Sequence, residues 1–581
     1  MAPPSSTPVV TRTGYQNFGS FFTENVEDLI CIPKDSYIAP EPPFTPPSLG
    51  DIATLDFGEP CRQLFNIDFE NWTFINHGAF GAVCRAAHQE SNQWREHCES
   101  QPLRFLDRQL FPHMVRVMRE MADFIGADPR DLVFVPNATT GLNVAIQAAG
   151  LRPGDTMYML NIGYGSVKKM AQAALAAAAG RGAGTAPAPA PAPGADITGG
   201  EAPGDINVVY GEVTFPLSSP RDIVDLVAAT MPPNTRLAVF DSVTSNTALV
   251  MPVSELTRLC KSRGVQVLID GAHALGQLHL DMRRGICGGT YHDSGSSSSN
   301  SGTKGDGHQT RPLQQVGSPA TASVSSTAAT VEAVNIAAAT ATAADVVADV
   351  VADVAADVAA SAGPQGSAPG NLVSPELDCV PDYFVSNCHK WLCAPRGSAI
   401  LWVAPNRQAF VRPLVVSHGS GCGFTSDFIW DGCRDYAPYL ATSSALALWR
   451  LLGPPRIRAY CRGLLGEAVA LLTARWGTTM LAPFLQMCGC MALVELPRAG
   501  LAETEPATST DAKYVQDLLH HVHAVECPVK CIQGRLYVRI SVHIYNILSD
   551  YERLAEAVDR IAASNSPSQA QAPDPDPAPN E

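Results

Sequence analysis

The sequence predicts an α/β fold in which a mostly parallel sheet is covered by helices on both faces, followed by a smaller α+β domain. Between residues 131 and 404, short apolar segments alternate with segments of helical spacing. The short segments are apolar at nearly every position, which is typical of parallel strands buried on both faces. After about residue 420 the pattern changes to long helices followed by strands, which indicates a second domain.

The elements of the large domain follow in chain order. Residues 91–100 and 114–126 have helical spacing, and residues 137–150 begin with cap-type residues and continue as a helix. Another helix, residues 254–263, leads into a strongly apolar strand. The predicted strands are residues 131–137, 155–161, 206–213, 235–243, 264–273, 381–389 and 398–404.

The smaller domain begins with helices and ends with one. Helical spacing predicts two long helices, residues 443–453 and 458–476. Two strands follow, residues 490–497 and 535–546, and the helix 551–563 closes the domain.

Composition divides the chain further. Residues 1–60 are rich in Pro and predict an irregular N-terminal arm. Two internal insertions are too biased in composition to pack into a core, and the tail is biased in the same way. We therefore expect a large domain of residues 61–283 and 377–420, interrupted by the insertions 176–205 and 284–376, then a small domain, 421–563, and a disordered tail, 564–581.

Charge and cysteine usage exclude several classes of function. The formal net charge is −16 and no basic cluster occurs, which argues against a nucleic-acid or anionic-membrane partner. No apolar run is long enough to span a bilayer. The spacings of the 16 cysteines fit no common zinc site, so we expect no metal. The N-terminus has no secretory pattern, so we expect a cytoplasmic protein with reduced thiols, and organelle targeting stays open.

Four segments carry candidate functional residues at the ends of predicted strands, where ligands of open α/β sheets bind. After the first strand, "NATTGLN" offers backbone donors at Ala138 and Thr139 and the hydroxyls of Thr139 and Thr140 to a phosphate. Taken alone this signal is weak, because Asn or Thr at a helix start is usually only a cap.

The other three segments carry charges in apolar surroundings. Asp270 ends an apolar strand with His273 close behind, although a strand-end Asp is often only a helix cap. Lys390 in "SNCHKWL" follows another strand, where a solvated surface lysine is the ordinary alternative. Arg539 lies inside an alternating strand and is either paired structurally or free to bind a substrate carboxylate. Together these residues suit pyridoxal phosphate, which needs a lysine, a carboxylate and phosphate donors, and an amino-acid substrate.

A series of motifs carries a family resemblance. "INHGAFG", "NATTGLN", "DGAHALGQ", "NCHKWLCAPRGSAILWV", "WDGCRDYAPYL" and "RISVHIYN" resemble the class V aminotransferase family. The chain is most similar to the branch with isopenicillin N epimerase-like proteins, L-cysteine desulfhydrases and hercynylcysteine sulfoxide lyases. The resemblance covers roughly residues 60–280 and 378–560. It implies the pyridoxal-phosphate fold type I, with a seven-stranded, mostly parallel sheet, and a homodimer.

The resemblance also implies roles for individual residues. Lys390 resembles the lysine that binds the cofactor covalently, Asp270 the carboxylate at the pyridine nitrogen, and His273 a side chain near the ring hydroxyl. Arg539 resembles the arginine for the substrate carboxylate. Further implied cofactor contacts are Ala138, Thr139, Thr140, Tyr164 as the stacking aromatic, Asn246, Asn387 and His389, and the implied substrate loop contains Asn76 and His77.

The chain departs from the family pattern at one motif. Cys433 stands where the family usually has a Thr that reaches the partner's phosphate, and a thiol is a weaker donor. Cys488 and Cys490 lie in a segment that predicts a strand, which favours structural thiols over a sulfur-accepting cysteine.

The resemblance implies a carbon–sulfur β-lyase that acts on L-cysteine or a cysteine S-conjugate or sulfoxide and releases a sulfur species, pyruvate and ammonia. An epimerase or a class V aminotransferase is the alternative, because all three reactions begin with removal of the Cα proton. A non-catalytic binding protein is a third possibility, against which intact Lys390 and Asp270 argue.

Overall fold

The computed structural model describes residues 21, 25–180, 206–285 and 379–564. The predicted insertions 176–205 and 284–376 and the tail 564–581 lie outside these ranges except at their margins. At one margin the structure differs from the expectation, because helix α8 (Gly165–Gly180) continues into the first residues of the predicted insertion.

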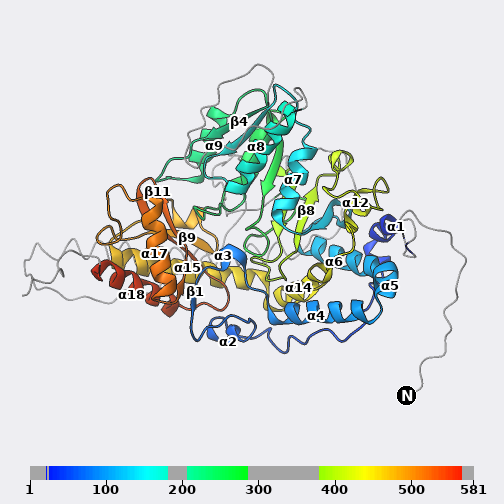
Figure 1. The fold of residues 1–581 in the computed structure, drawn as a ribbon, viewed down its shortest axis with the longest axis horizontal. Helices are drawn as coiled ribbons and strands as arrows, with labels where there is room; N and C mark the ends of the chain where they lie inside the picture. The colour runs from blue at the N-terminus through cyan, green and yellow to red at the C-terminus, as the bar shows by residue number, and fades with distance from the viewer. Residues whose placement is uncertain (1–20, 22–24, 181–205, 286–378, 565–581) are drawn as a thin grey trace, which may run out of the picture.

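The central feature is a seven-stranded sheet with the order β2-β8-β7-β6-β5-β3-β4 (Figure 1). The contacts β7–β6, β6–β5, β5–β3 and β3–β4 are parallel, whereas β8 runs antiparallel to both of its neighbours. The predicted mostly parallel sheet is therefore confirmed. The strands are β2 (Leu132–Val135), β3 (Thr156–Leu160), β4 (Asn207–Gly211), β5 (Thr235–Asp241), β6 (Gln266–Asp270), β7 (Tyr383–Asn387) and β8 (Ala399–Val403).

Helices cover both faces of this sheet, since every residue of β6, β7 and β8 is buried. Helix α7 (Ala138–Ala148) packs against β6, β7 and β8, and α10 (Val253–Ser262) packs against β5 and β6. The close approach of α7 depends on Gly141, where an added Cβ would lie 2.8 Å from a methyl group of Val385. Helices α8 and α9 (Pro220–Thr230) pack against β4.

The N-terminal part of the chain forms helices that pack beside the sheet (Figure 1). The predicted arm is not wholly irregular, because Val26 and Ile30 of α1 are buried against the core. The helices of this part are α1 (Val26–Cys31), α2 (Glu59–Arg62), α3 (His77–Phe80), α4 (Arg85–Ser100), α5 (Pro102–Arg104) and α6 (Leu110–Phe124).

The C-terminal part forms an antiparallel sheet of order β11-β12-β9, with helices against it. Strand β12 ends at Ser541, earlier than predicted, and α17 and β11 were not predicted. Strand β1 (Thr73–Phe74) pairs with β10 (Val525–Glu526) and joins the N-terminal segment to this part. Its elements are α15 (Pro454–Trp476), α16 (Phe484–Met487), β9 (Met491–Glu495), α17 (Ser509–His521), β11 (Val529–Ile532), β12 (Arg535–Ser541) and α18 (Leu548–Ser564). The helices α12 (Phe424–Ile429), α13 (Ala437–Leu440) and α14 (Thr442–Leu452) pack instead against β2, α4 and α6.

The two ends that flank the second insertion lie in contact. A Cβ added to Gly285 would lie 2.9 Å from the Cβ of Cys379. We therefore expect that replacing residues 290–370 with a short Gly/Ser linker leaves the fold intact, because loop closure costs little when the ends already meet. Thermal unfolding followed by circular dichroism checks this prediction. Loss of the cooperative transition in the shortened chain would contradict it.

Candidate active site

Three neighbouring strands end in polar residues at one edge of the sheet. Asp241, Asp270 and Asn387 are the last residues of β5, β6 and β7, and Asp241 is paired in register with Asp270. Lys390 lies in a tight turn after β7. In this turn the N–H of Cys393 donates a hydrogen bond to the carbonyl of Lys390. Parallel strands bring their carboxyl ends to the same edge, so the topology itself places the amine beside the two carboxylates.

The Lys390 amine contacts an imidazole whose tautomer is fixed by its other neighbour. Lys390 Nζ lies 3.0 Å from Nε2 of His273, and the indole N–H of Trp391 donates to Nδ1 of His273 at 3.2 Å. An indole nitrogen can only donate, so neutral His273 carries its proton on Nε2 and donates it to the amine. Lys390 must then offer a lone pair, which requires the neutral amine.

Electrostatics at Lys390 agree with that hydrogen-bond pattern. Burial lowers the pKa of Lys390 to about 8, with the charge of Arg539 acting in the same direction and that of Asp270 opposing it. Burial and the Lys390 charge also hold the pKa of His273 well below its ordinary value. More of the amine is therefore unprotonated near neutral pH than in an exposed lysine, which favours its action as a nucleophile or base.

Two buried imidazoles hold the backbone of the lysine turn. His77 Nε2 contacts the carbonyl of Lys390 at 3.0 Å, while its Nδ1 contacts the hydroxyl of Tyr545 at 2.7 Å. His543 Nε2 contacts the next carbonyl, that of Trp391, at 3.2 Å. Both nitrogens of His77 have protein partners, so we propose that it holds the lysine turn, and its contact with substrate stays a prediction.

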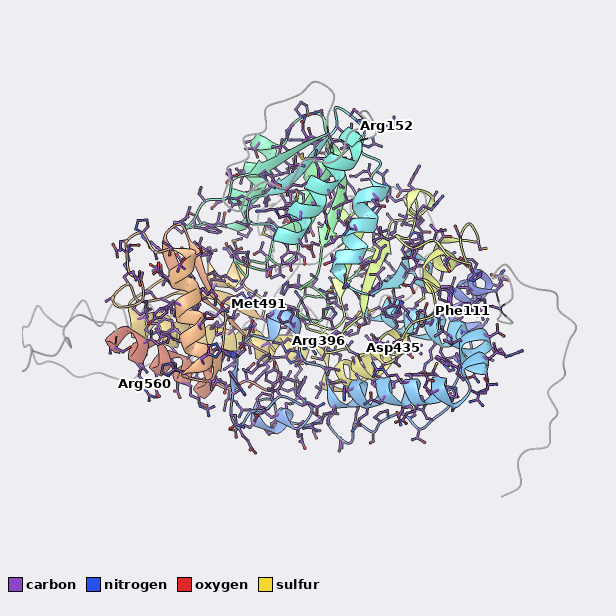
Figure 2. The ribbon with its side chains drawn as sticks, viewed as in Figure 1. Phe111, Arg152, Arg396, Asp435, Met491 and Arg560 are labelled. Carbon is purple, nitrogen blue, oxygen red and sulfur yellow. The ribbon has the colours of Figure 1, made fainter. Side chains whose placement is uncertain are left out.

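The same turn explains why the motif "INHGAFG" contains glycines. Gly81 has φ +67°, and a Cβ there would lie 2.0 Å from the carbonyl oxygen of His389 and 2.7 Å from Cα of Lys390. Arg396 donates to the Gly81 carbonyl at 3.0 Å, and Met491 packs on Gly78 at the start of α3. Figure 2 shows Arg396 and Met491 near the centre of the molecule, where the two parts of the fold meet.

We predict that His77→Phe destabilises the protein and lowers turnover. The substitution leaves the Lys390 carbonyl without its donor, which costs about 1–3 kcal/mol of unfolding free energy and loosens the turn. Urea unfolding measures this cost. His88→Phe, on the exposed side of α4, is the matched control and should change little. Equal stability of the two variants would contradict the assigned role.

His77, Cys393 and His543 bring three potential ligand atoms within 4.8 Å of one another. All three residues are buried, and burial raises the pKa of the Cys393 thiol well above its ordinary value. Because both histidines already direct Nε2 at backbone carbonyls and the thiol is protonated, we interpret this cluster as support for the lysine turn.

Asp270 and Asp241 form a coupled pair of carboxylates. One oxygen of Asp270 accepts the N–H of Ala272 at 3.0 Å. Burial raises the pKa of Asp270, and the Lys390 charge opposes that rise. Burial and the charge of Asp270 raise the pKa of Asp241 well above its ordinary value. Two adjacent carboxylates cannot both ionise easily, so Asp241 holds the proton and Asp270, nearer the lysine, carries the charge.

Arg539 is a buried cation with an incomplete set of partners. One nitrogen donates to the carbonyl of Ser245, another donates to Oδ1 of Asn76 at 3.1 Å, and its Nε has no partner. Asn76 in turn donates to Glu526 at 2.9 Å. Within the described ranges no carboxylate forms an ion pair with Arg539, and burial lowers its pKa to about 10. A buried guanidinium of this kind favours an anionic ligand.

The N-terminus of α7 retains fewer free donors than the sequence predicts. The N–H of Ala138 donates to Oδ1 of Asn387 at 2.9 Å, and that of Thr140 donates to the cap residue Asn137. The N–H and hydroxyl of Thr139, on an exposed residue, are the donors left for a phosphate. His389 directs Nδ1 at the carbonyl of Ser398, and burial lowers its pKa to about 4, so its Nε2 is an acceptor unless a nearby anion stabilises the protonated imidazole.

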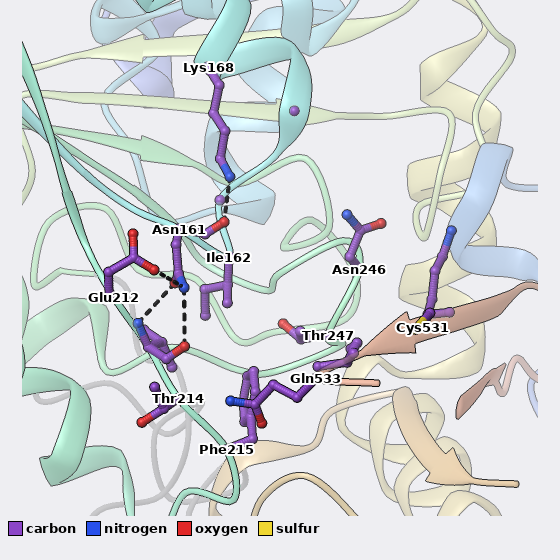
Figure 3. Close-up of a pocket in the computed structure, with 15 residues that line it drawn as sticks. Asn161, Ile162, Lys168, Glu212, Thr214, Phe215, Asn246, Thr247, Cys531 and Gln533 are labelled. Atoms are coloured by element: carbon purple, nitrogen blue, oxygen red, sulfur yellow. Dashed lines mark hydrogen bonds between the residues drawn. The ribbon is translucent and has the colours of Figure 1, made fainter. Parts of the chain in front are cut away.

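Tyr164 and Asn246 lie at the outer side of the site. Tyr164 precedes α8, and its side chain is 43% exposed. Asn246 is exposed and lines a cavity of about 490 Å³ between the loops of the large sheet and the β11–β12 hairpin (Figure 3). Cys433 is exposed as well and contributes nothing to the site of its own chain, whereas Cys488 and Cys490 are buried.

Sequence reasoning missed three residues that shape the site. Asp241 ends an apolar strand as Asp270 does, so the same strand-end rule would have found it. Trp391 and His543 gave no such signal, because their contacts with His273 and the lysine turn depend on the tertiary fold.

Comparisons with curated proteins agree with the motifs. The chain is 23% identical over 537 residues to an L-cysteine desulfhydrase of Arabidopsis thaliana, covering 85% of this chain and 90% of the relative. It is 24% identical over 504 residues to an isopenicillin N epimerase of Streptomyces clavuligerus, covering 84% and 94%. A hercynylcysteine sulfoxide lyase of Schizosaccharomyces pombe is 19% identical over 512 residues, covering 86% and 97%. No protein-family model matches the chain.

Solved structures share the fold. The cystine C–S lyase C-DES, in complex with cysteine persulfide, superimposes with a TM-score of 0.55 at 15% identity, covering 86% of this chain and 98% of that chain. A C-DES variant with glycine linked covalently to its PLP cofactor gives a TM-score of 0.54 at 14% identity, covering 85% and 96%. The predicted fold type and family resemblance are thus confirmed. No helix in the described ranges is long and apolar enough to cross a membrane.

Proposed function

We propose that this protein is a pyridoxal-phosphate-dependent carbon–sulfur β-lyase. Its substrate is L-cysteine or a cysteine S-conjugate or sulfoxide, and its products are a sulfur species, pyruvate and ammonia. The observation that carries the proposal is the Lys390 amine, whose pKa is lowered to about 8 by burial and which lies with Asp270 at the carboxyl edge of the sheet. The oxidation states balance without a further oxidant, because L-cysteine and water give sulfide, pyruvate and ammonia.

The residues present fit the cofactor. Asp270 has one carboxylate oxygen without a hydrogen-bond partner among the described residues, which suits a protonated pyridine nitrogen. Thr139 offers a free N–H at a helix N-terminus, where a phosphate is stabilised. Lys390 supplies the amine that an aldehyde needs. When bound, pyridoxal phosphate would supply an electron sink for breaking bonds at Cα and Cβ of an amino acid.

The side chains of the chain supply the other parts of catalysis. Arg539, buried and without an ion-pair partner among the described residues, would bind the substrate carboxylate and so orient the Cα–H bond. Lys390 would take the Cα proton once its single lone pair is released from the hydrogen bond with the Nε2–H of His273. Asn76 keeps the planar guanidinium of Arg539 in place from the other side.

The choice of lyase rests on the relatives. Several are named L-cysteine desulfhydrases and one a hercynylcysteine sulfoxide lyase. Two relatives named isopenicillin N epimerase match over a similar length, so epimerisation is the second candidate. Epimerisation requires an acid on the face of the substrate opposite Lys390.

A direct assay separates these candidates. The purified protein, loaded with pyridoxal phosphate, is incubated with L-cysteine and with neutral S-alkyl conjugates. Sulfide or thiol, pyruvate and ammonia are measured in parallel with optical rotation. Stoichiometric sulfide and pyruvate are expected. Racemisation without pyruvate release from any sulfur amino acid would reject the lyase proposal and favour an epimerase.

We also propose a cytoplasmic homodimer. All cysteines of the described residues are free thiols, which supports a reducing compartment. Phe410, Leu414, Val415 and Val416 are exposed apolar residues in one segment, which supports a protein interface. We predict that Val416→Asp shifts the protein from dimer to monomer in light scattering coupled to size exclusion. The matched substitution Val522→Asp, at an isolated exposed valine, should leave a dimer, and a wild-type monomer would refute the dimer.

A further inference from the structure

The cavity lined by Asn246 extends beyond the space that a cysteine side chain needs. We propose that it receives an anionic group at the far end of the substrate and that Lys530 binds this group. The preferred substrates are then cysteine S-conjugates whose sulfur substituent carries a second carboxylate. This inference rests on the proposed lyase function and names its substrate class.

The cavity lies between two parts of the fold. Its walls are loops that follow β3, β4 and β5 on one side and the β11–β12 hairpin on the other (Figure 3). Its volume of about 490 Å³ falls in the range of sites that enclose whole small molecules. L-cysteine alone, with one sulfur beyond Cβ, would leave most of this volume to water.

Lys530 and Arg539 project from the same face of the C-terminal sheet. Lys530 of β11 is paired with Tyr537 of β12, and Arg539 follows Tyr537 by two positions, so the two cations are diagonal neighbours. Burial and the charge of Arg539 both lower the pKa of Lys530. Within the described ranges neither cation has a carboxylate ion-pair partner. Two like charges held together without counter-ions favour the binding of anions.

The cavity lies next to the loop residue that accepts a hydrogen bond from the Arg539 guanidinium. Arg539 donates to the carbonyl of Ser245, and the next residue, Asn246, lines the cavity together with Lys530. A substrate whose α-carboxylate binds Arg539 can therefore extend its sulfur substituent along Asn246 toward Lys530. The spacing of the two cations on adjacent strands suits a compound with two carboxylates rather than one.

The other charged residues of the cavity already have hydrogen-bond partners within the protein. Glu212 accepts a hydrogen bond from Asn161 at 2.8 Å, as Figure 3 shows. The Lys168 amine donates to the carbonyl of Asn161 and lies 5.6 Å from the centre of the Tyr210 ring. Lys530 is therefore the cation of this cavity that remains free for a ligand.

A matched pair of substrates tests the proposal. S-(2-carboxyethyl)-L-cysteine and its side-chain amide, S-(2-carbamoylethyl)-L-cysteine, have nearly the same shape and differ in charge. We expect the loaded wild-type enzyme to prefer the acid by about tenfold or more in kcat/KM and in Kd. Lys530→Gln should reduce the preference to about twofold or less, and Lys530→Arg should retain it. Lys169→Gln, at an exposed lysine, controls for net charge and should behave as wild type.

Two readouts distinguish this inference from the lyase proposal. Kd is obtained from the change in the visible absorption of the loaded enzyme on ligand addition, without turnover, whereas pyruvate release reports the reaction. Tighter binding of the acid with no pyruvate would refute the lyase and leave the anion site standing. Pyruvate from both compounds with equal Kd values, or a preference unchanged in Lys530→Gln, would refute the anion site alone.

Discussion

Replacing Lys390 by Ala is expected to lower turnover by ~10³-fold or more, because the substitution removes both the covalent anchor and the base. The variant should still bind pyridoxal phosphate through Asp270 and the α7 N-terminus, yet lack the visible absorption of a lysine-linked cofactor. Added alkylamines should restore part of the activity, since a small amine can occupy the space left by the side chain. Lys169→Ala is the control. Activity close to wild type in Lys390→Ala would reject the role of Lys390.

The same lysine has a predicted effect on stability that does not depend on turnover. The pKa of Lys390 is lowered from 10.5 to about 8 in the folded protein. The unfolded chain therefore binds this proton more tightly, and the free energy of unfolding rises as the pH increases from about 8 to 10.5. Below pH 8 the full cost, ~3 kcal/mol, is present. In the cofactor-free protein, Lys390→Met should raise Tm at pH 7 and lose this advantage near pH 10.5; an unchanged Tm at pH 7 would contradict the lowered pKa.

The fold and some residues of the candidate site could be predicted from the sequence. Apolar strands followed by Asp270 and Lys390 indicated which edge of the sheet binds the ligand, because parallel strands present their carboxyl ends together. The fully buried strands left little ambiguity about the sheet. Strand β11 was missed because the half-buried segment Val529–Ile532 lacks a clear apolar alternation.

The contacts that tune the site could not be read from one sequence. The proton on His273 is fixed by Trp391, and the lysine turn is held by His77, far away along the chain. Such contacts follow from tertiary packing, which motif spacing does not describe. The same holds for Ala138, whose N–H was expected to face a phosphate and instead binds Asn387. The motif thus predicted a phosphate loop without specifying which donors remain free.

Asp270→Asn is expected to lower kcat by ~10²–10³-fold, because an amide cannot stabilise a positive charge on a pyridine nitrogen as a carboxylate does. The neighbouring Asp241 makes this prediction specific. In the wild type the charge of Asp270 raises the pKa of Asp241, so Asp241 holds a proton. Removal of the Asp270 charge lowers the pKa of Asp241, and Asp241 then ionises on the adjacent strand.

The pH dependence of the free energy of unfolding shows which of the two carboxyls, Asp241 or Asp270, is ionised. A carboxyl with a raised pKa binds its proton more tightly in the folded state, so the free energy of unfolding falls as the pH rises from the ordinary value near 4 through the raised one. In the cofactor-free protein, Asp241→Asn should reduce this fall to the part that the raised pKa of Asp270 contributes, and Asp270→Asn should shift it to lower pH. For turnover, Asp241→Asn alone should cost far less than Asp270→Asn, since the charge of Asp270 acts more strongly on the pKa of Lys390 than that of Asp241 does. If Asp241→Asn instead lost as much kcat as Asp270→Asn, Asp241 would be the carboxylate that carries the charge.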